Sequence, residues 1–351
     1  MTKMLYLVTG AFGHLGSQIV KLLLKRGDAV RALMLPREDD SLLRGLPMEV
    51  VLGDVRDKES LRPFFDVPAD VKALVIHAAG IVSIAAKVNE NLRRVNVEGT
   101  KNVVELCRER GAGRLLYISS VHALPEKPKG TSVAEVNAFD SGSVKGAYAK
   151  TKAEASQIVM DAAKSGLNAV IVHPSGIIGP GDNGRNPSNQ VFRDYLYGRL
   201  PAIVRGGYDF VDVRDVAMGC LLALDKGRAG ECYILSNAHF DMRRLMDLLQ
   251  KAAGIKRRPI ALPLGLVAAF SPLAEALDGL RSRTPVFTRY SLYTLNTNDW
   301  FVSDKAKKEL GYTVRPVEET MRDIVLWERE RQGPPAGKRE RWPKAAPAKG
   351  K

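Results

Sequence analysis

The sequence predicts an α/β fold in which a doubly wound parallel sheet is joined to a smaller, interleaved C-terminal domain. The first half alternates short apolar runs with longer amphipathic ones, as successive strand-helix-strand units do. A glycine-rich turn separates the first apolar run from the first amphipathic one. After Pro180 the alternation loosens and several prolines interrupt any long helix, so the smaller domain is expected there.

The expected elements follow one another along the first half. The predicted strands are apolar runs followed by polar or glycine-rich turns, at residues 5–9, 29–35, 49–52, 71–76, 114–118 and 169–172. Longer runs predict helices at about residues 12–26, 88–110 and 148–164. Gly27 is expected to end the first helix. Residues 210–223 are expected to return to the main sheet before the chain leaves it again.

Composition and charge limit the classes of protein that remain. The 351 residues carry a formal charge of +14, and +5 of it comes from six Lys or Arg and one Glu in residues 334–351, a tail expected to be disordered. No reading helix or aromatic platform is recognisable, so no nucleic-acid partner is expected. The chain shows no long uncharged apolar stretch and no signal-peptide pattern, so we expect a cytoplasmic protein without an integral membrane segment.

The three cysteines, Cys107, Cys220 and Cys232, lie far apart in apolar patterns. None has the Cys or His neighbours that a metal site requires. Reduced core cysteines and no metal are therefore expected.

A phosphate-binding turn is predicted near the N-terminus. Gly10, Gly13 and Gly16 follow the first strand and open the first helix. Glycines allow a sharp turn and a close approach of the backbone to pyrophosphate, and the helix N-terminus offers N–H donors to the anion. A turn of glycines without a ligand is the alternative, which three glycines at the required offsets disfavour.

The candidate chemistry lies at the start of the third predicted helix. Tyr148 and Lys152 are one turn apart and therefore share a face. An ammonium beside a tyrosine stabilises the phenolate and should lower the phenol pKa, which makes the tyrosine a usable acid or base. Ser119 and Ser120 end the strand that lies 28 residues earlier. A tyrosine and a lysine at this spacing are common by chance, so the residues around Tyr148 and Lys152 decide whether the pair is catalytic.

Together, the TGxxGxxG turn, Ser120 and the Tyr148/Lys152 pair resemble the extended branch of the short-chain dehydrogenase/reductase family. The resemblance implies a Rossmann sheet that binds NADP or NAD, an NAD(P)-dependent oxidoreductase acting on CH–OH groups, and catalysis by Ser120, Tyr148 and Lys152. Ser120 would hold the substrate oxygen, Tyr148 would move the proton, and Lys152 would also hold the nicotinamide ribose. The expected cofactor-binding residues are Gly10, Phe12, Gly13, Leu15, Gly16, Arg37, Asp54, Val55, Ala78, Ala79, Gly80, Asn96, Tyr148, Lys152, Pro174 and Ile177.

Several of these residues take their expected roles from the family's motifs. Asp54 is expected to bind the adenine amino group, residues 77–80 to line the adenosine, and Asn96 to be a structural asparagine. Residues 173–182 are similar to a segment beside the nicotinamide carboxamide, with His173 in place of the usual arginine; a buried histidine bonded to the backbone is the simpler expectation. His122 either touches the substrate or only lies in its loop.

The choice of cofactor depends on the end of the second strand. Met34 stands where NAD-using relatives have an acid that binds the ribose diol. Arg37 follows and could clamp a 2′-phosphate, so NADP is slightly favoured. The acids at positions 38–40 could instead reach a ribose, so NAD stays open.

For the substrate, residues 30–32, 96–100 and 210–217 look most similar to 3β-hydroxysteroid dehydrogenase-like and dihydroflavonol 4-reductase-like proteins. We therefore expect interconversion of a secondary alcohol and a ketone on an apolar, ring-containing small molecule. The alternative is a nucleotide-sugar 4-epimerase with tightly bound NAD. A dehydratase is disfavoured because no acid follows Ser120, and a non-catalytic sensor because Tyr148 and Lys152 are both present.

The expected domains are residues 1–180, which bind the dinucleotide and to which residues 208–236 return, and residues 181–207 with 237–333, which bind the substrate. The apolar run 262–270 is a substrate wall, plain domain core or a weak membrane-surface contact. A homodimer through the helices near 89–110 and 148–164 is possible by the same resemblance.

Overall fold

A parallel sheet of seven strands forms the centre of the protein. The computed structural model describes residues 3–83, 89–184, 186–200, 202–256, 259–263, 293–294 and 297–332, so the tail at 334–351 and most of the run 262–270 lie outside the described residues. The strand order is β10-β6-β5-β4-β1-β2-β3, and every neighbouring pair is parallel. The strands are β1 (Lys3–Thr9), β2 (Ala29–Met34), β3 (Glu49–Leu52), β4 (Val71–His77), β5 (Arg114–Ile118), β6 (Ala169–Pro174) and β10 (Cys232–Leu235).

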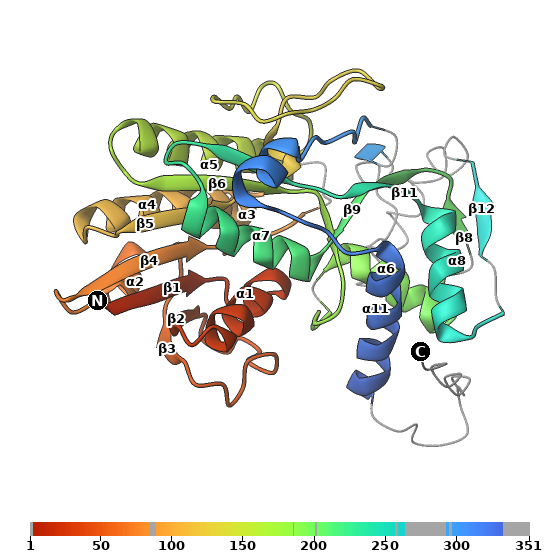
Figure 1. The fold of residues 1–351 in the computed structure, drawn as a ribbon, viewed down its shortest axis with the longest axis horizontal. Helices are drawn as coiled ribbons and strands as arrows, with labels where there is room; N and C mark the ends of the chain where they lie inside the picture. The colour runs from red at the N-terminus through yellow and green to blue at the C-terminus, as the bar shows by residue number, and fades with distance from the viewer. Residues whose placement is uncertain are drawn as a thin grey trace.

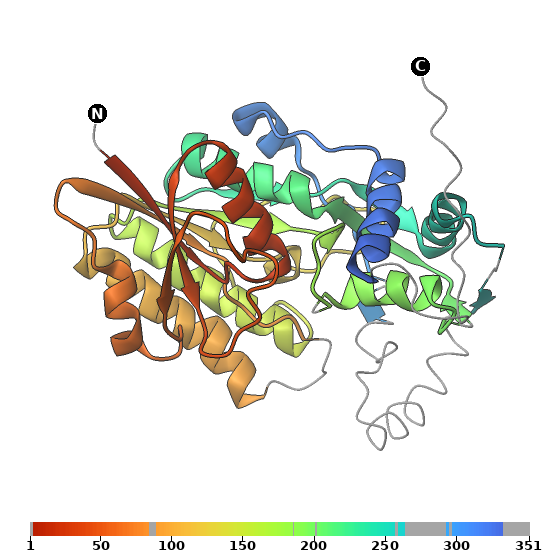
Figure 2. The same cartoon turned by 90° about the horizontal axis from the view of Figure 1, so that it is seen from below.

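Helices cover both faces of this sheet (Figures 1 and 2). One face carries α1 (His14–Lys25) and α7 (Val213–Lys226), and the other carries α2 (Lys58–Phe65), α4 (Gly99–Glu109) and α5 (Ala147–Lys164). Successive strand residues alternate between two apolar cores: Leu7 packs with the second group of helices and Val8 with the first. The sheet is therefore buried on both sides, as parallel sheets generally are. The doubly wound α/β class predicted from the sequence is confirmed.

A smaller region extends beyond the carboxyl ends of the strands. Strands β7 (Gly176–Ile178), β9 (Gly207–Asp212) and β11 (Ala238–Asp241) form a second sheet, and β8 (Ala202–Val204) pairs with β12 (Ile260–Leu262). A third apolar core joins them to α6 (Pro187–Leu196), α8 (Met242–Ala253) and α11 (Val317–Gln332). A π-helical turn, η3 (Ala306–Leu310), packs on α7.

The predicted helix at 88–110 is interrupted. It consists of α3 (Glu90–Arg93), a π-helical turn η1 (Arg94–Glu98) and α4. Such a turn inserts one residue into the helical ladder and often marks a functional site. Here it contains Asn96.

The strand near residue 210 and the helix α2 differ from what the sequence predicts. The strand near residue 210 is β9 of the second sheet, where it pairs with β7 and β11, and the main sheet regains a strand only at β10. Within the predicted segment 210–223, only α7, which begins at Val213, returns to the main sheet. Helix α2 was not predicted, and Asp57 begins it by accepting a hydrogen bond from the Glu59 N–H. Its eight residues include Pro63, which hides the helical pattern.

Candidate active site

The glycine-rich turn joins β1 to α1 and packs against the next strand of the sheet. Gly10 has a φ of +65°, and a Cβ there would lie 2.6 Å from the backbone nitrogen of Ala79. A Cβ on Gly16 would lie 2.0 Å from the carbonyl oxygen of Gly10. These two positions accept only glycine, because the turn must contact both residues 78–79 and its own helix.

The N-terminus of α1 suits a bound anion. Gly13 precedes the helix, no side chain caps it, and the first turn holds no acidic residue. The backbone N–H groups there are the natural donors to a dinucleotide pyrophosphate. Phe12 is 1% exposed and packs in the core with Leu15 beside it, so both would meet a cofactor through their backbone. The turn therefore fits the dinucleotide cofactor that the sequence implies.

The edge formed by the ends of β2 and β3 holds the residues expected around the adenosine. Arg37 is exposed and is the only described non-glycine residue with a positive φ, at 66°. The Asp54 carboxylate pairs with Arg56 at 2.6 Å, and the hydrogen bonds from Arg56 lower the pKa of that carboxyl. Val55 is buried, and its carbonyl oxygen accepts a hydrogen bond from Asn102. Arg56, which no sequence motif indicated, brings a second guanidinium to this edge.

Asn96 connects the loop after β4 to α5. Its side chain accepts a hydrogen bond from the Ile81 N–H at 2.8 Å and donates to the Ile81 carbonyl oxygen at 3.0 Å. It also donates to Thr151 Oγ1 at 3.1 Å, next to Lys152 in the chain. The asparagine is 1% exposed, and the structural role expected for it is what these contacts show. Ala78 and Ala79 are partly buried and Gly80 is exposed, directly before this loop.

Ser120 and Tyr148 lie together where β5 meets α5. Both side chains are buried, and a hydrogen bond involving the Ser120 hydroxyl lowers the pKa of Tyr148. Burial has the larger, opposite effect and raises the pKa of the phenol to about 12. The expectation that Lys152 lowers this pKa is therefore wrong for the structure described. Desolvation of the phenolate outweighs the stabilising contacts, so Tyr148 carries its proton at neutral pH.

Lys152 lies one turn further along α5 and is 6% exposed. Its Nζ donates to the Ile118 carbonyl oxygen at 2.7 Å and lies 3.4 Å from the Tyr117 hydroxyl. A Cβ on Gly80 would lie 3.5 Å from Nζ, so the ammonium borders the segment expected to line the ribose. Burial lowers the pKa of Lys152 to about 7.

Two histidines flank the Ser120 turn. His173 is fully buried and its Nδ1 lies 2.9 Å from the Ser120 carbonyl oxygen, which confirms the expected backbone contact. Burial lowers its pKa to about 4. The backbone N–H of His122 donates to Ser120 Oγ at 3.2 Å, and the His122 ring packs edge-on against Tyr148, with centroids 6.0 Å apart. Burial lowers the pKa of His122 to about 4, so both rings are neutral near pH 7.

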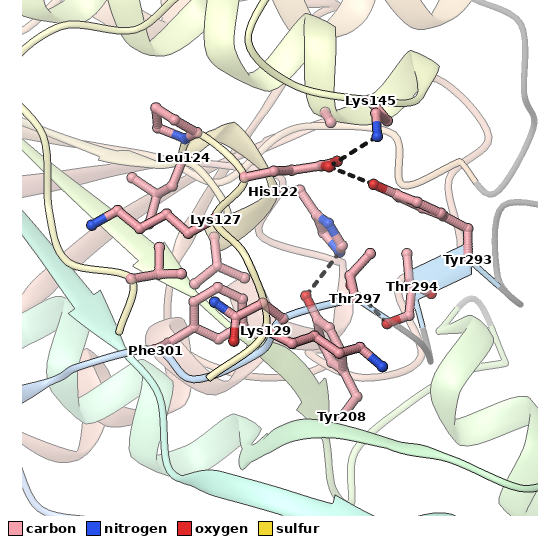
Figure 3. A pocket seen from close by; sticks show the side chains of 16 residues that line it. His122, Leu124, Lys127, Lys129, Lys145, Tyr208, Tyr293, Thr294, Thr297 and Phe301 are labelled. Atoms are coloured by element: carbon pink, nitrogen blue, oxygen red, sulfur yellow. Dashed lines mark hydrogen bonds and ion pairs between the residues drawn. The ribbon is translucent and has the colours of Figure 1, made fainter. Parts of the chain in front are cut away.

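His122 also lines a cavity of about 240 Å³ (Figure 3). Side chains of the segment 121–133 line it, together with Lys145, Ala149, Tyr208, Tyr293, Thr294, Thr297, Asn298 and Phe301. Tyr208 stacks on His122, and its hydroxyl lies 3.4 Å from His122 Nε2, the contact drawn dashed in Figure 3. Glu126 accepts a hydrogen bond from Tyr293 and pairs with Lys145 at 3.5 Å. His122 thus contacts Tyr148 and also lines the cavity, and no sequence motif indicated the lining residues Tyr208 and Tyr293.

The segment expected beside the nicotinamide begins at the end of β6. Pro174 is buried at that end, and Ile177 is partly buried in β7. Asn186 donates to the Ile177 carbonyl oxygen at 2.9 Å and also lies 2.9 Å from His14 Nδ1. His14 Nε2 contacts the Pro180 carbonyl oxygen at 3.0 Å. These contacts join the glycine-rich turn to the segment expected beside the nicotinamide.

The structure also bears on the cysteines, on metal binding and on membrane spans. The three cysteines are buried and unbonded, as expected. Among the described residues, no cluster of three or more His, Cys, Asp or Glu side chains could hold a metal ion. None of the helices in the described ranges is long and apolar enough to cross a membrane.

A doubly wound sheet with an uncapped, glycine-lined helix N-terminus beside a buried Ser, Tyr and Lys defines a class of dinucleotide-dependent oxidoreductases. Comparison with known proteins agrees with this class. The chain belongs to the NAD dependent epimerase/dehydratase family, whose sequence profile matches residues 6–236. It is an NAD(P)-dependent oxidoreductase of the extended short-chain dehydrogenase/reductase type.

Proteins with different names are similar to this chain over nearly its whole length. Sterol demethylase protein B of Methylococcus capsulatus is 35% identical over 93% of this chain and 98% of its own. A putative dihydroflavonol 4-reductase of Synechocystis sp. is 30% identical over 92% and 94%. The crystal structure of gox2253 superposes with a TM-score of 0.80 at 32% identity, over 94% of this chain and 99% of the other. A UDP-glucose 4-epimerase from Thermotoga maritima, at 20% identity and a TM-score of 0.74 over 94% and 100%, shares the fold.

Proposed function

We propose that the chain interconverts a secondary alcohol and a ketone on an apolar, ring-containing molecule that resembles a 3β-hydroxysteroid or a flavonoid. The observation that carries the proposal is that His122 contacts both Tyr148 and Ser120 and also lines the cavity. Apolar and aromatic side chains line much of that cavity, among them Val121, Leu124, Val133, Tyr208 and Phe301. Pockets of this composition favour apolar molecules with a few polar groups. Sterol demethylase protein B, by its name, acts on sterols.

In the proposed mechanism, Ser120 and Tyr148 bind the same substrate oxygen through their hydroxyl groups. Because the Tyr148 pKa is about 12, the phenol keeps its proton near neutrality and donates it to the oxygen of a ketone. In the oxidative direction the same oxygen returns the proton to Tyr148. A dinucleotide bound at the α1 N-terminus would supply or accept the hydride at nicotinamide C4. Lys152 would hold the nicotinamide ribose, close to Gly80.

We propose NADP as the preferred cofactor. The acids that could bind a ribose diol have other partners: Glu38 accepts a hydrogen bond from the Leu35 N–H, Asp39 from Ser41, and Asp40 from Arg44. Arg37, on the same edge, would bind the 2′-phosphate with its planar guanidinium. We expect Arg37→Ala to weaken NADPH binding by about tenfold or more and NADH binding by less than about twofold. Titration calorimetry with both cofactors measures this, and equal losses would count against NADP preference.

The domains and the homodimer expected from the sequence also remain proposals. Residues 181–207 and 237–333 would supply the outer substrate walls, as the cavity-lining residues Tyr293, Thr297 and Phe301 illustrate. The homodimer would form through α4 and α5. Light scattering tests it directly, because a dimer has twice the mass of the 38.4-kDa chain.

The test of the proposed activity is a substrate panel assayed with both cofactors. We expect a change in reduced-nicotinamide absorbance with 3β-hydroxysteroids or the matching ketones, and no nucleotide retained through purification. An epimerase would instead retain NAD and interconvert a nucleotide sugar without a net change in cofactor. That second pattern would replace the proposed function with the epimerase alternative.

A further inference from the structure

A row of buried polar side chains crosses three strands of the main sheet beneath α5. Thr9, His77 and Tyr117 are register partners on β1, β4 and β5, so their side chains point to the same face. Thr9 Oγ1 lies 2.7 Å from His77 Nδ1, and His77 Nε2 lies 3.1 Å from Thr100 Oγ1. None of the four is more than 1% exposed. Buried polar groups lower the stability of the folded protein unless they are paired. A row of them in an apolar core therefore points to a function.

The row ends at Lys152. The Lys152 Nζ lies 3.4 Å from the Tyr117 hydroxyl and 4.9 Å from the centroid of the Tyr117 ring. The residues on the opposite side of Tyr117 from Lys152 hold its ring in place. The Tyr117 ring stacks on His77, with centroids 5.6 Å apart, and the Tyr117 hydroxyl is hydrogen-bonded to Thr100. A cation over an aromatic face is attracted most strongly where water is excluded. Lys152 is in such a place, and Tyr117 cannot turn away from it.

We propose that Tyr117 is a positioning residue for Lys152, whose ammonium its ring face and hydroxyl hold in the place from which Lys152 binds the nicotinamide ribose. This inference rests on the proposed function, which gives Lys152 that role. The opposite end of the row supports the other part of the cofactor site, because Thr9 Oγ1 accepts the Ala79 N–H at 3.2 Å. One buried row thus connects the pyrophosphate-binding turn to the ribose-binding lysine.

Few groups are placed to stabilise the Lys152 ammonium. No carboxylate among the described residues pairs with Lys152, and the titratable side chains that face it are Tyr117, Tyr148 and the neutral His77 and His173. The ammonium is therefore stabilised by the Ile118 carbonyl oxygen and by Tyr117. Burial already lowers the Lys152 pKa to about 7, so weaker support would lower it further.

The experiment compares full cofactor with a fragment that lacks the nicotinamide ribose. NADPH and adenosine 2′,5′-bisphosphate are titrated calorimetrically into wild type, Tyr117→Leu and Tyr117→Phe from pH 6 to pH 9, with NADH and ADP as the pair if NADH binds more tightly. Phe64→Leu is the control, because Phe64 is fully buried in the same apolar core and belongs to α2. No substrate is needed, so the outcome is independent of the proposed reaction.

We expect Tyr117→Leu to weaken NADPH binding about tenfold and to leave the fragment within about twofold. Tyr117→Phe keeps the ring, so NADPH affinity at pH 6 is expected within about twofold of wild type, with the pH midpoint of binding moved to lower pH. Phe64→Leu should change neither ligand. Equal losses for NADPH and the fragment, or no loss in Tyr117→Leu, would overturn the inference. If Tyr117→Leu fails to fold, an unchanged pH midpoint in Tyr117→Phe overturns it.

Discussion

At the scale of single residues, the protonation of Tyr148 sets the expected chemistry. Its pKa of about 12 comes from burial, and the neighbouring Ser120 hydroxyl offsets only part of that effect. The phenol is thus a proton donor at neutral pH, which suits reduction of a ketone. The serine, tyrosine and lysine could be found from the sequence by their spacing, but this pKa could not, because it depends on what covers the side chain after folding.

Tyr148→Phe is expected to reduce kcat at least about 100-fold, because it removes the proton donor and keeps the ring. NADPH affinity should stay within about twofold of wild type, since the phenol is not expected to bind the cofactor's phosphates. Steady-state kinetics and calorimetry measure the two effects. A variant with full turnover would remove Tyr148 from the mechanism.

Buried histidines predict how stability depends on pH. Burial lowers the pKa of His77 to about 3 and that of His173 to about 4, against an ordinary value of 6.5. Below pH 6.5 the unfolded chain binds protons that the folded protein excludes, so the free energy of unfolding falls as pH falls from about 6.5 to about 4. Each histidine contributes about 1.4 kcal/mol per pH unit. Asp209, whose pKa burial raises to about 6, acts in the opposite sense over part of this range.

His173→Asn tests this account, because an asparagine amide can still donate to the Ser120 carbonyl oxygen and does not titrate. The variant should lose about 1.4 kcal/mol per pH unit from the slope of stability between about pH 6 and pH 4.5. Urea unfolding at several pH values measures both slopes. Identical slopes would mean that His173 is not held neutral.

At the scale of elements, the turn between β1 and α1 is closely packed against backbone. A Cβ on Gly16 would lie 2.0 Å from the Gly10 carbonyl oxygen, and backbone cannot yield as a flexible side chain does. The sequence predicted this turn because its signal is local: three glycines between a strand and a helix. The π-helical turn at Asn96 and the short helix α2 have no comparable local signal. Contacts with Ile81, Thr151 and the apolar core determine them instead.

Gly16→Ala should therefore lower the free energy of unfolding by about 2–4 kcal/mol and weaken NADPH binding by more than about tenfold. Gly142→Ala is the matched control, because a Cβ at that exposed position would meet only the flexible Asp140 carboxylate, at 3.2 Å. Urea unfolding and calorimetry measure the two changes. Equal behaviour of the two variants would contradict the close packing of the turn.

At the scale of the whole molecule, a buried ion network ties the segment after β7 to the C-terminal helix α11. Arg193 contacts Asp182 at 2.9 Å and Glu328 at 3.0 Å, and all three are at most 5% exposed. Tyr197 donates to Glu328 at 3.1 Å, and Trp327 donates to the Asp182 carbonyl oxygen at 3.1 Å. The network unites residues 146 positions apart, so no sequence pattern indicates it. The same holds for the row from Thr9 to Lys152 and for the contribution of Tyr293, Thr297 and Phe301 to the cavity wall.

Arg193→Met should lower the free energy of unfolding by about 3–5 kcal/mol, because it leaves two buried carboxylates without their partner. Arg244→Met is the control: its ion pair with Glu318 is exposed, and such pairs contribute about 1 kcal/mol or less. Thermal and urea unfolding compare the two variants. A loss below about 1 kcal/mol in Arg193→Met would show that the network does not hold α11 in place.

The central claim is that an exchangeable cofactor passes a hydride to a carbonyl carbon with Tyr148 as the proton donor. Incubation with NADPH deuterated at the transferred C4 position and a 3-ketosteroid, followed by mass spectrometry of cofactor and product, tests it most directly. We expect deuterium on the new carbinol carbon, one oxidised cofactor per alcohol, and neither product with Tyr148→Phe. Deuterium that never leaves the cofactor with any ketone, together with inversion of a nucleotide sugar at constant cofactor, would contradict it.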